Sequence, residues 1–277
     1  MAGLDLPAWS EPFTGDRRAA LAHLVPFPGV DREWAFGGAD GSGVTVAIVD
    51  SGVERDHPAV GGRLVAGVRV DLVDGEPVVV DDPEGTDVFG HGTACAGIVH
   101  ALAPAAELLS VRVLGADLRG KGVAFAAGLE WAIDHGATVA NLSLSSKSER
   151  LFGLFHEIAD RAYFANALLV CAANNVPGPS YPSLFSSVVS VAAHDVADPW
   201  VWFYNPSPPV EFGAHGVDVR VAWNDGGSTV ATGNSFAAPH LAAIAALIRS
   251  KHPELTPFEL KSLLAATAND ARTVAGP

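Results

Sequence analysis

The chain has 277 residues, of which 49% are hydrophobic, and its 31 acidic and 17 basic side chains give a formal net charge of −14. This composition is typical of a globular chain with enough apolar side chains for a large core. Proteins that bind nucleic acids or membrane surfaces usually carry a basic block, which this sequence lacks, so we expect neither as a partner.

The first 43 residues differ from the rest of the chain. They contain Pro7, Pro12, Pro26 and Pro28 and a glycine-rich run over residues 37–43. One short helix is possible over residues 16–24. We interpret residues 1–43 as an N-terminal extension packed on a single main domain that spans residues 44–277.

From about residue 44 onward, short β-branched runs alternate with helical patterns. Strands are predicted over 44–50, 107–114, 138–144, 167–173 and 187–193, and helices over 92–102, 123–135, 150–164, 237–250 and 256–267. This alternation predicts an α/β fold in three layers, with a mostly parallel central sheet and helices on both faces. In such a sheet, ligands bind outside the carboxyl ends of the strands.

Two further features bear on location. Cys95 and Cys171 cannot build a disulfide framework, and residues 1–20 lack the apolar centre of a secretory signal. The apolar stretch over 236–248 is interrupted by Pro239 and is too short to span a bilayer. We therefore expect a cytoplasmic protein; the sequence gives no oligomeric state.

Three side chains suited to nucleophilic catalysis stand where predicted strands meet helices. Asp50 ends the first strong strand, His91 lies between two glycines before a helix, and Ser235 opens the helix that continues with an apolar run. Singly, each has an ordinary structural explanation, such as a strand-end turn or a helix cap. Together, in the order Asp, His, Ser, they match one chain order known for a catalytic triad.

The segments around these residues resemble the subtilisin-like serine proteases, the subtilases. They read VAIVDSGVERDHP, GHGTACAGIV and GNSFAAPHLAA, and the runs VLGADLRGKGVAFAAGLEWAI and VANLSLSS add to the resemblance. It extends over roughly residues 28–270. The resemblance implies a subtilisin-like fold and a serine endopeptidase that needs no cofactor and acts on a peptide or protein.

The resemblance also implies a role for each residue of the site. Ser235 attacks the scissile carbonyl, His91 takes and returns the proton, and Asp50 fixes and stabilises the imidazole. Asn175 is expected to supply one oxyanion donor, with the amide of Ser235 as the second. An extended substrate would add a strand to each of two backbone edges, formed by Gly120, Lys121 and Gly122 and by Ser143, Leu144 and Ser145.

Several positions depart from the family pattern. Ser145 and Ser146 replace a Gly-Gly pair and Asn174 replaces the glycine before Asn175, which predicts a smaller or more polar pocket for the residue preceding the cut. Phe236 replaces the usual methionine, which predicts tolerance of peroxide. Asn234 replaces the threonine before the nucleophile and keeps a polar group there.

The loops around the site carry further expectations. The run from His91 to Pro104 has no calcium-loop insertion and Ala59 stands where a ligand would be, so we expect no metal. The acidic run 81–87 is either a solvated loop or a determinant that favours basic substrate residues through Asp87. Residues 23–28 are either a packed arm or a segment that blocks the cleft.

Alternatives to a general endopeptidase stay open at this stage. A protease that matures one peptide would carry the same residues. A peptide ligase or macrocyclase on the same fold would pass the acyl-enzyme to an amine instead of water. A pseudoprotease that binds peptides without cutting them is disfavoured by the complete set of Asp50, His91, Ser235 and Asn175.

Overall fold

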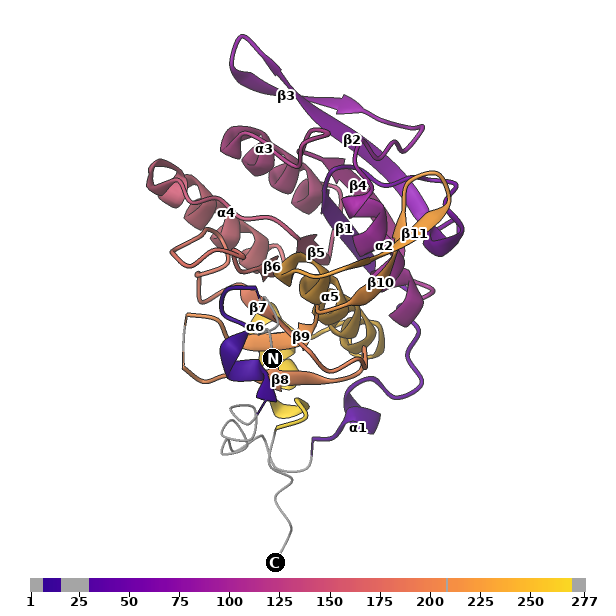
Figure 1. Cartoon of the computed structure of the whole chain (residues 1–277), viewed down its shortest axis with the longest axis vertical. Helices are drawn as coiled ribbons and strands as arrows, with labels where there is room; N and C mark the ends of the chain where they lie inside the picture. The colour runs from indigo at the N-terminus through magenta and orange to yellow at the C-terminus, as the bar shows by residue number, and fades with distance from the viewer. Residues whose placement is uncertain (1–6, 16–29, 208, 271–277) are drawn as a thin grey trace, which may run out of the picture.

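The computed structural model describes residues 7–15, 30–207 and 209–270 (Figure 1). Its helices are α1 Arg32–Phe36, α2 His91–Leu102, α3 Gly122–Asp134, α4 Phe152–Phe164, α5 Asn234–Lys251 and α6 Pro257–Ala266. Its strands are β1 Thr45–Asp50, β2 Leu64–Val73, β3 Glu76–Asp81, β4 Glu107–Arg112, β5 Val139–Leu142, β6 Leu168–Ala172, β7 Val189–His194, β8 Trp202–Tyr204, β9 Phe212–His215, β10 Val219–Trp223 and β11 Gly227–Ala231.

Within the described residues, one nine-stranded sheet runs in the order β3-β2-β4-β1-β5-β6-β7-β9-β8. All neighbours from β2 to β9 in this order are parallel, whereas the edge strands β3 and β8 are antiparallel to their partners. The strand β1 therefore lies inside the sheet, and its last residue, Asp50, lies at the carboxyl edge of the sheet. β10 and β11 form a separate hairpin.

The alternation of side chains along β1 accounts for the three layers. Val46 and Ile48 belong to the apolar core shared with α2 and α5, whereas Ala47 and Val49 belong to the core shared with α3 and α4. Figure 1 shows α3 and α4 on one side of the sheet and α2 and α5 on the other. Because both faces of the strand are covered, it reads as a continuous apolar run.

The predicted α/β architecture is confirmed, with boundaries shifted by a few residues. All five predicted strands correspond to β1, β4, β5, β6 and β7, and all five predicted helices outside the extension are present. The strands missed were β2, β3 and β8–β11. β2, β3, β10 and β11 are partly exposed, so they lack the continuous apolar runs that identify buried strands. β8 and β9 are largely buried, but with 3 and 4 residues they are too short to give such a run. The possible helix over 16–24 lies outside the described residues.

The described parts of the N-terminal extension contact the main domain at several places. Residues 7–15 include a short 3-10 helix, Glu11–Phe13, whose Phe13 is fully buried. Near α1, the Trp34 ring stacks on His252 at 4.4 Å between centroids. None of the described helices has the length and hydropathy needed to cross a bilayer.

Candidate active site

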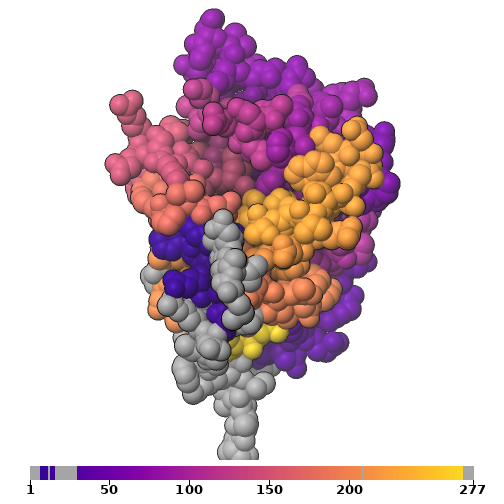
Figure 2. Space-filling model, in the orientation of Figure 1, coloured from indigo at the N-terminus to yellow at the C-terminus, as the bar shows by residue number. Residues whose placement is uncertain are grey.

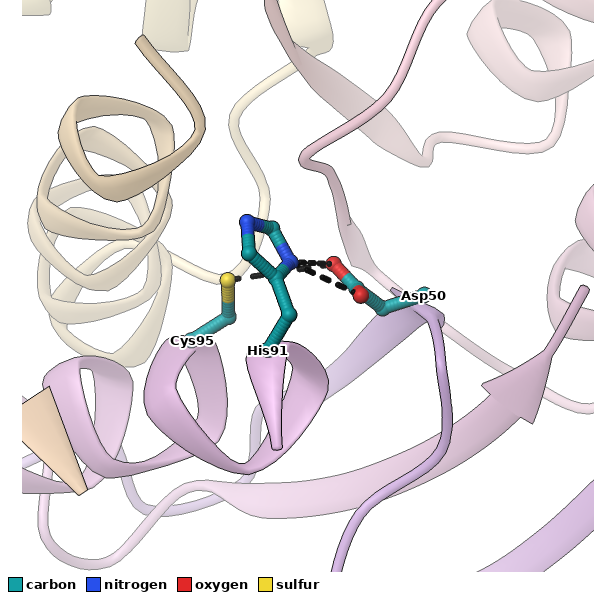
Figure 3. A group of neighbouring side chains, drawn as sticks. All are labelled: Asp50, His91 and Cys95. Atoms are coloured by element: carbon teal, nitrogen blue, oxygen red, sulfur yellow. Dashed lines mark hydrogen bonds and ion pairs between the residues drawn. The ribbon is translucent and has the colours of Figure 1, made fainter. Parts of the chain in front are cut away.

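Asp50 and His91 meet at the carboxyl edge of the sheet (Figure 3). Asp50 ends β1 and is fully buried, and His91 is the first residue of α2. The Nδ1 atom of His91 lies 2.8 Å from Oδ1 and 2.9 Å from Oδ2 of Asp50. Gly92 permits this approach, because a Cβ atom there would collide with the carbonyl oxygen of Gly52.

Ser235, on α5, is the third residue at this site. It lies in the first turn of α5, half-buried, and its Oγ is 2.9 Å from His91 Nε2. The backbone N–H groups of a first helical turn have no intrahelical acceptor, so the turn favours a developing negative charge. The imidazole of His91 thus lies between a carboxylate and a hydroxyl, and the structure brings together the three residues singled out in the sequence.

Opposing effects set the pKa of His91. Burial lowers it, but the neighbouring Asp50 carboxylate and the contact with Cys95 raise it, and the pKa stands well above the usual 6.5. The charged form of the imidazole is therefore stabilised in this site. That is the form His91 adopts after it accepts a proton.

Cys95 lies one turn along α2 from His91 (Figure 3). Its Sγ is 3.2 Å from Ser143 Oγ and 3.8 Å from Asp50 Oδ2. Burial raises the pKa of this thiol, so it stays protonated. The ligating atoms of Asp50, His91 and Cys95 lie within 4.8 Å of one another, a spacing that a metal ion also requires. The Asp50 and His91 atoms in this group are already hydrogen-bonded to each other, and we assign them to the Asp-His pair.

A proline in α5 explains the position of Ser143. Pro239 has no N–H, so the carbonyl oxygen of Ser235, four residues earlier, lacks its helical donor. Ser143 Oγ donates to that carbonyl at 2.7 Å and itself accepts from Asn141 Nδ2 at 2.9 Å. The side chain of Ser143 thus holds the main chain of Ser235, a contact that sequence reasoning missed although the proline signals it.

Asn175 lies on the exposed loop after β6, beside the start of α5. Its Oδ1 accepts a hydrogen bond of 2.9 Å from the backbone N–H of Asn234. A Cβ atom placed on Gly233 would lie 3.2 Å from Ser235 Oγ and 3.6 Å from Asn175 Nδ2, so both atoms flank the same point. The structure thus brings the amide of Asn175 to the side of Ser235, where the sequence predicted an oxyanion donor.

The two predicted substrate edges line one cavity of about 670 Å³. Its lining includes Gly120, Lys121, Gly122, Leu144 and Ser145, together with Ser146 and Leu72. Of the predicted substrate-binding residues, Ser143 and Asn174 are not in this lining. Ser143 is turned toward α5, and Asn174 Oδ1 accepts from Val176 N at 2.9 Å within its own loop.

The carboxylate of Asp87 is engaged in hydrogen bonds within the protein. Its Oδ1 accepts from Ser51 Oγ and from the N–H groups of Phe89 and Gly90, and its Oδ2 accepts from Thr93 N and Oγ. These hydrogen bonds of the carboxylate join the loop after β1 to the start of α2. The other predicted regulatory segment, residues 23–28, lies outside the described residues.

Known proteins are similar to this chain in sequence and in fold. A family model described as the subtilase family matches residues 41–276. Subtilisin BL of Lederbergia lenta is 35% identical over 244 residues, which cover 83% of this chain and 85% of that protein. Thermitase of Thermoactinomyces vulgaris is 32% identical over 250 residues, 86% of this chain and 84% of the relative.

A solved structure agrees with these sequence matches. The crystal structure of a cold adapted subtilisin-like serine proteinase has a TM-score of 0.70 and 27% identity, covering 93% of this chain and 94% of that one. The chain therefore belongs to the subtilase family. It is a subtilisin-like serine endopeptidase that acts on peptides or proteins.

Proposed function

We propose that Asp50, His91 and Ser235 form the catalytic triad of this endopeptidase. The observation that carries the assignment is the imidazole of His91, whose two nitrogens lie 2.8 Å from Asp50 Oδ1 and 2.9 Å from Ser235 Oγ. As Ser235 Oγ attacks the carbonyl carbon, His91 Nε2 takes its proton and then gives it to the departing amine. Asp50 holds the Nδ1–H and stabilises the imidazolium. Water attacks the acyl-enzyme by the same route.

The oxyanion of the tetrahedral intermediate needs donors that are fixed in advance. We assign this role to Asn175 Nδ2 and to the backbone N–H of Ser235. The support is the placement of Asn175 Nδ2 and Ser235 Oγ around the same point beside Gly233. Because Asn175 Oδ1 is held by Asn234 N, the amide nitrogen is the end left to face the substrate.

The substrate is proposed to lie extended between the edges 120–122 and 143–145. The two edges meet at one cavity, which supports a peptide held by main-chain hydrogen bonds and hence a broad sequence tolerance. Because of Ser145 and Ser146, we still expect a small or polar pocket for the substrate residue that precedes the cut. A library of peptides that varies this residue tests the prediction, and preferred cleavage after large aromatic residues would contradict it.

Labelling with a fluorophosphonate tests the triad directly. Such a reagent reacts fast only with a serine that is activated by its base and oxyanion hole. We expect one adduct on the intact protein by mass, and none on Ser235→Ala. A protein that cleaves peptides yet gives no adduct at Ser235 would show that the nucleophile is another residue.

Two finer predictions stay with this proposal. Product masses from a peptide substrate distinguish hydrolysis from transfer of the acyl group to an amine, because only hydrolysis adds the mass of water.

A cytoplasmic location is supported by Cys95 and Cys171, both free and buried. Fractionation of the native cells checks it, and recovery of the protein outside the cytoplasm would contradict it.

A further inference from the structure

The N-terminal segment formed by residues 7–13 reaches the loop that carries Asn175. The backbone of Ala8 makes two hydrogen bonds there. Its N–H donates to the carbonyl oxygen of Asn175 at 2.9 Å, and its carbonyl oxygen accepts from Asn234 Nδ2 at 2.9 Å. Asn175 is the proposed oxyanion donor, and Asn234 immediately precedes Ser235. One residue near the start of the chain therefore contacts both Asn175 and the residue that precedes Ser235.

Asn234 joins these contacts into one network. Its side chain is fully buried; Oδ1 accepts from Ala193 N at 2.9 Å, and Nδ2 donates to Ala173 O at 3.1 Å as well as to Ala8. Its backbone N–H holds Asn175 Oδ1. Because buried polar groups keep their partners, the orientation of the Asn175 carboxamide depends on where Asn234 is held.

Phe13 anchors the other end of the segment. Its side chain is fully buried and packs with Ala173, Ala192, Phe203 and Val210 in a small apolar cluster separate from the two main cores. Gly213 in β9 leaves room for it, since a Cβ atom there would collide with the Phe13 ring. Figure 2 shows the indigo residues of this segment beneath the salmon-coloured part of the chain.

We propose that residues 7–13 act as a positioning element for the oxyanion hole. Phe13 fixes the segment, Ala8 holds the main chain of Asn175 and the side chain of Asn234, and Asn234 orients the Asn175 carboxamide. This inference rests on the role proposed above for Asn175. A donor that stabilises the transition state must be placed within a fraction of an ångström, so a loosened segment lowers kcat and leaves KM unchanged.

The test uses Phe13→Ala in the full chain, with kcat expressed per active site titrated by fluorophosphonate. We expect kcat to fall by about 10- to 100-fold, the loss that a small misplacement causes, with KM changed by no more than about twofold. Phe13→Leu, which refills most of the space, restores kcat. Phe155→Ala in α4, which removes an equally buried ring from a separate apolar core, lowers stability but not kcat per titrated site.

The same substitution in an Asn175→Ala background identifies the route. If the segment acts through Asn175, Phe13→Ala causes no further loss of kcat there. An equal loss in both backgrounds, or an unchanged or raised kcat in the native background, would overturn the inference. Should Phe13→Ala fail to fold, Ala8→Pro, which removes the N–H donated to Asn175 and also fixes φ at this position, is measured in the same two backgrounds.

These outcomes separate the inference from the function on which it rests. If Asn175→Ala alone leaves kcat unchanged, the oxyanion assignment is wrong and the inference falls with it. If Asn175→Ala lowers kcat while Phe13→Ala and Ala8→Pro do not, only the role of residues 7–13 is wrong.

Discussion

The ring of Phe236 packs against that of His91, with 5.0 Å between the two centroids. Phe236 directly follows the proposed nucleophile and is almost fully buried. The position beside Ser235 therefore holds no thioether, and the chain's one methionine is Met1. This packing has a direct consequence for oxidation.

Hydrogen peroxide is expected to leave the activity of the protein nearly unchanged, whereas Phe236→Met becomes sensitive. Oxidation would convert the introduced thioether into a polar sulfoxide next to Ser235. The nearby Cys95 thiol is protected because it is buried and protonated. Residual kcat/KM after timed exposure measures the effect. Rapid inactivation of the unmodified protein would contradict the prediction.

The raised pKa of His91 predicts activity displaced toward alkaline pH. His91 must be neutral to accept the proton of Ser235, so kcat/KM rises as the pH passes the His91 pKa, which lies above 6.5. A profile of kcat/KM against pH checks this, and an inflection at or below 6.5 would refute it. In Asp50→Asn the carboxylate that raises the pKa is lost, so the inflection moves to lower pH and kcat falls by about 10⁴-fold.

His240 predicts a loss of stability in acid. It lies fully inside α5 beside His215, and burial lowers its pKa from 6.5 to about 3, while Nδ1 contacts the carbonyl oxygen of Phe236 at 2.8 Å. Between these two pH values the unfolded chain binds a proton that the folded chain does not. The contribution is therefore complete above pH 6.5 and declines as the pH falls toward 3, by about 1.4 kcal/mol per pH unit.

Urea unfolding of the native protein and of His240→Gln, at several values between pH 7 and 4, measures this contribution. The free energy of unfolding should fall more steeply with decreasing pH in the native protein. Carboxylates contribute to both proteins alike, and His215, whose pKa burial also lowers, leaves a residual slope in the variant. Parallel curves would show that His240 does not titrate in this way.

The Asp87 network predicts a structural role for this carboxylate. Asp87→Asn places an amide N–H₂ among groups that are themselves donors, so we expect a loss of about 1–3 kcal/mol in the free energy of unfolding. Cleavage next to lysine or arginine should not change. Asp81→Asn is the matched control, because it removes the same charge from an exposed position of the same acidic run. Destabilisation by both substitutions to the same extent would argue against the network.

Most of the fold could be predicted from the sequence, because the strongest signals for strands and helices are local. The β-branched runs that became β1 and β4–β7 are buried on both faces, and their apolar continuity needs no knowledge of distant contacts. β2 and β3 were missed for the complementary reason: much of this hairpin faces solvent, and its pairing is set by β4, far along the chain. The residues of the triad were predicted from motif and order.

The tertiary structure decided how those residues are supported. Sequence patterns placed Asp87 and Ser143 on the substrate side, but both side chains turn inward, one to five donors around α2 and the other to the carbonyl freed by Pro239. The contacts of Ala8 with Asn175 and Asn234 join parts of the chain that no local pattern connects. A motif specifies which groups are present, because residue type is local. Which hydrogen bonds they make depends on donors and acceptors that only folding brings within reach.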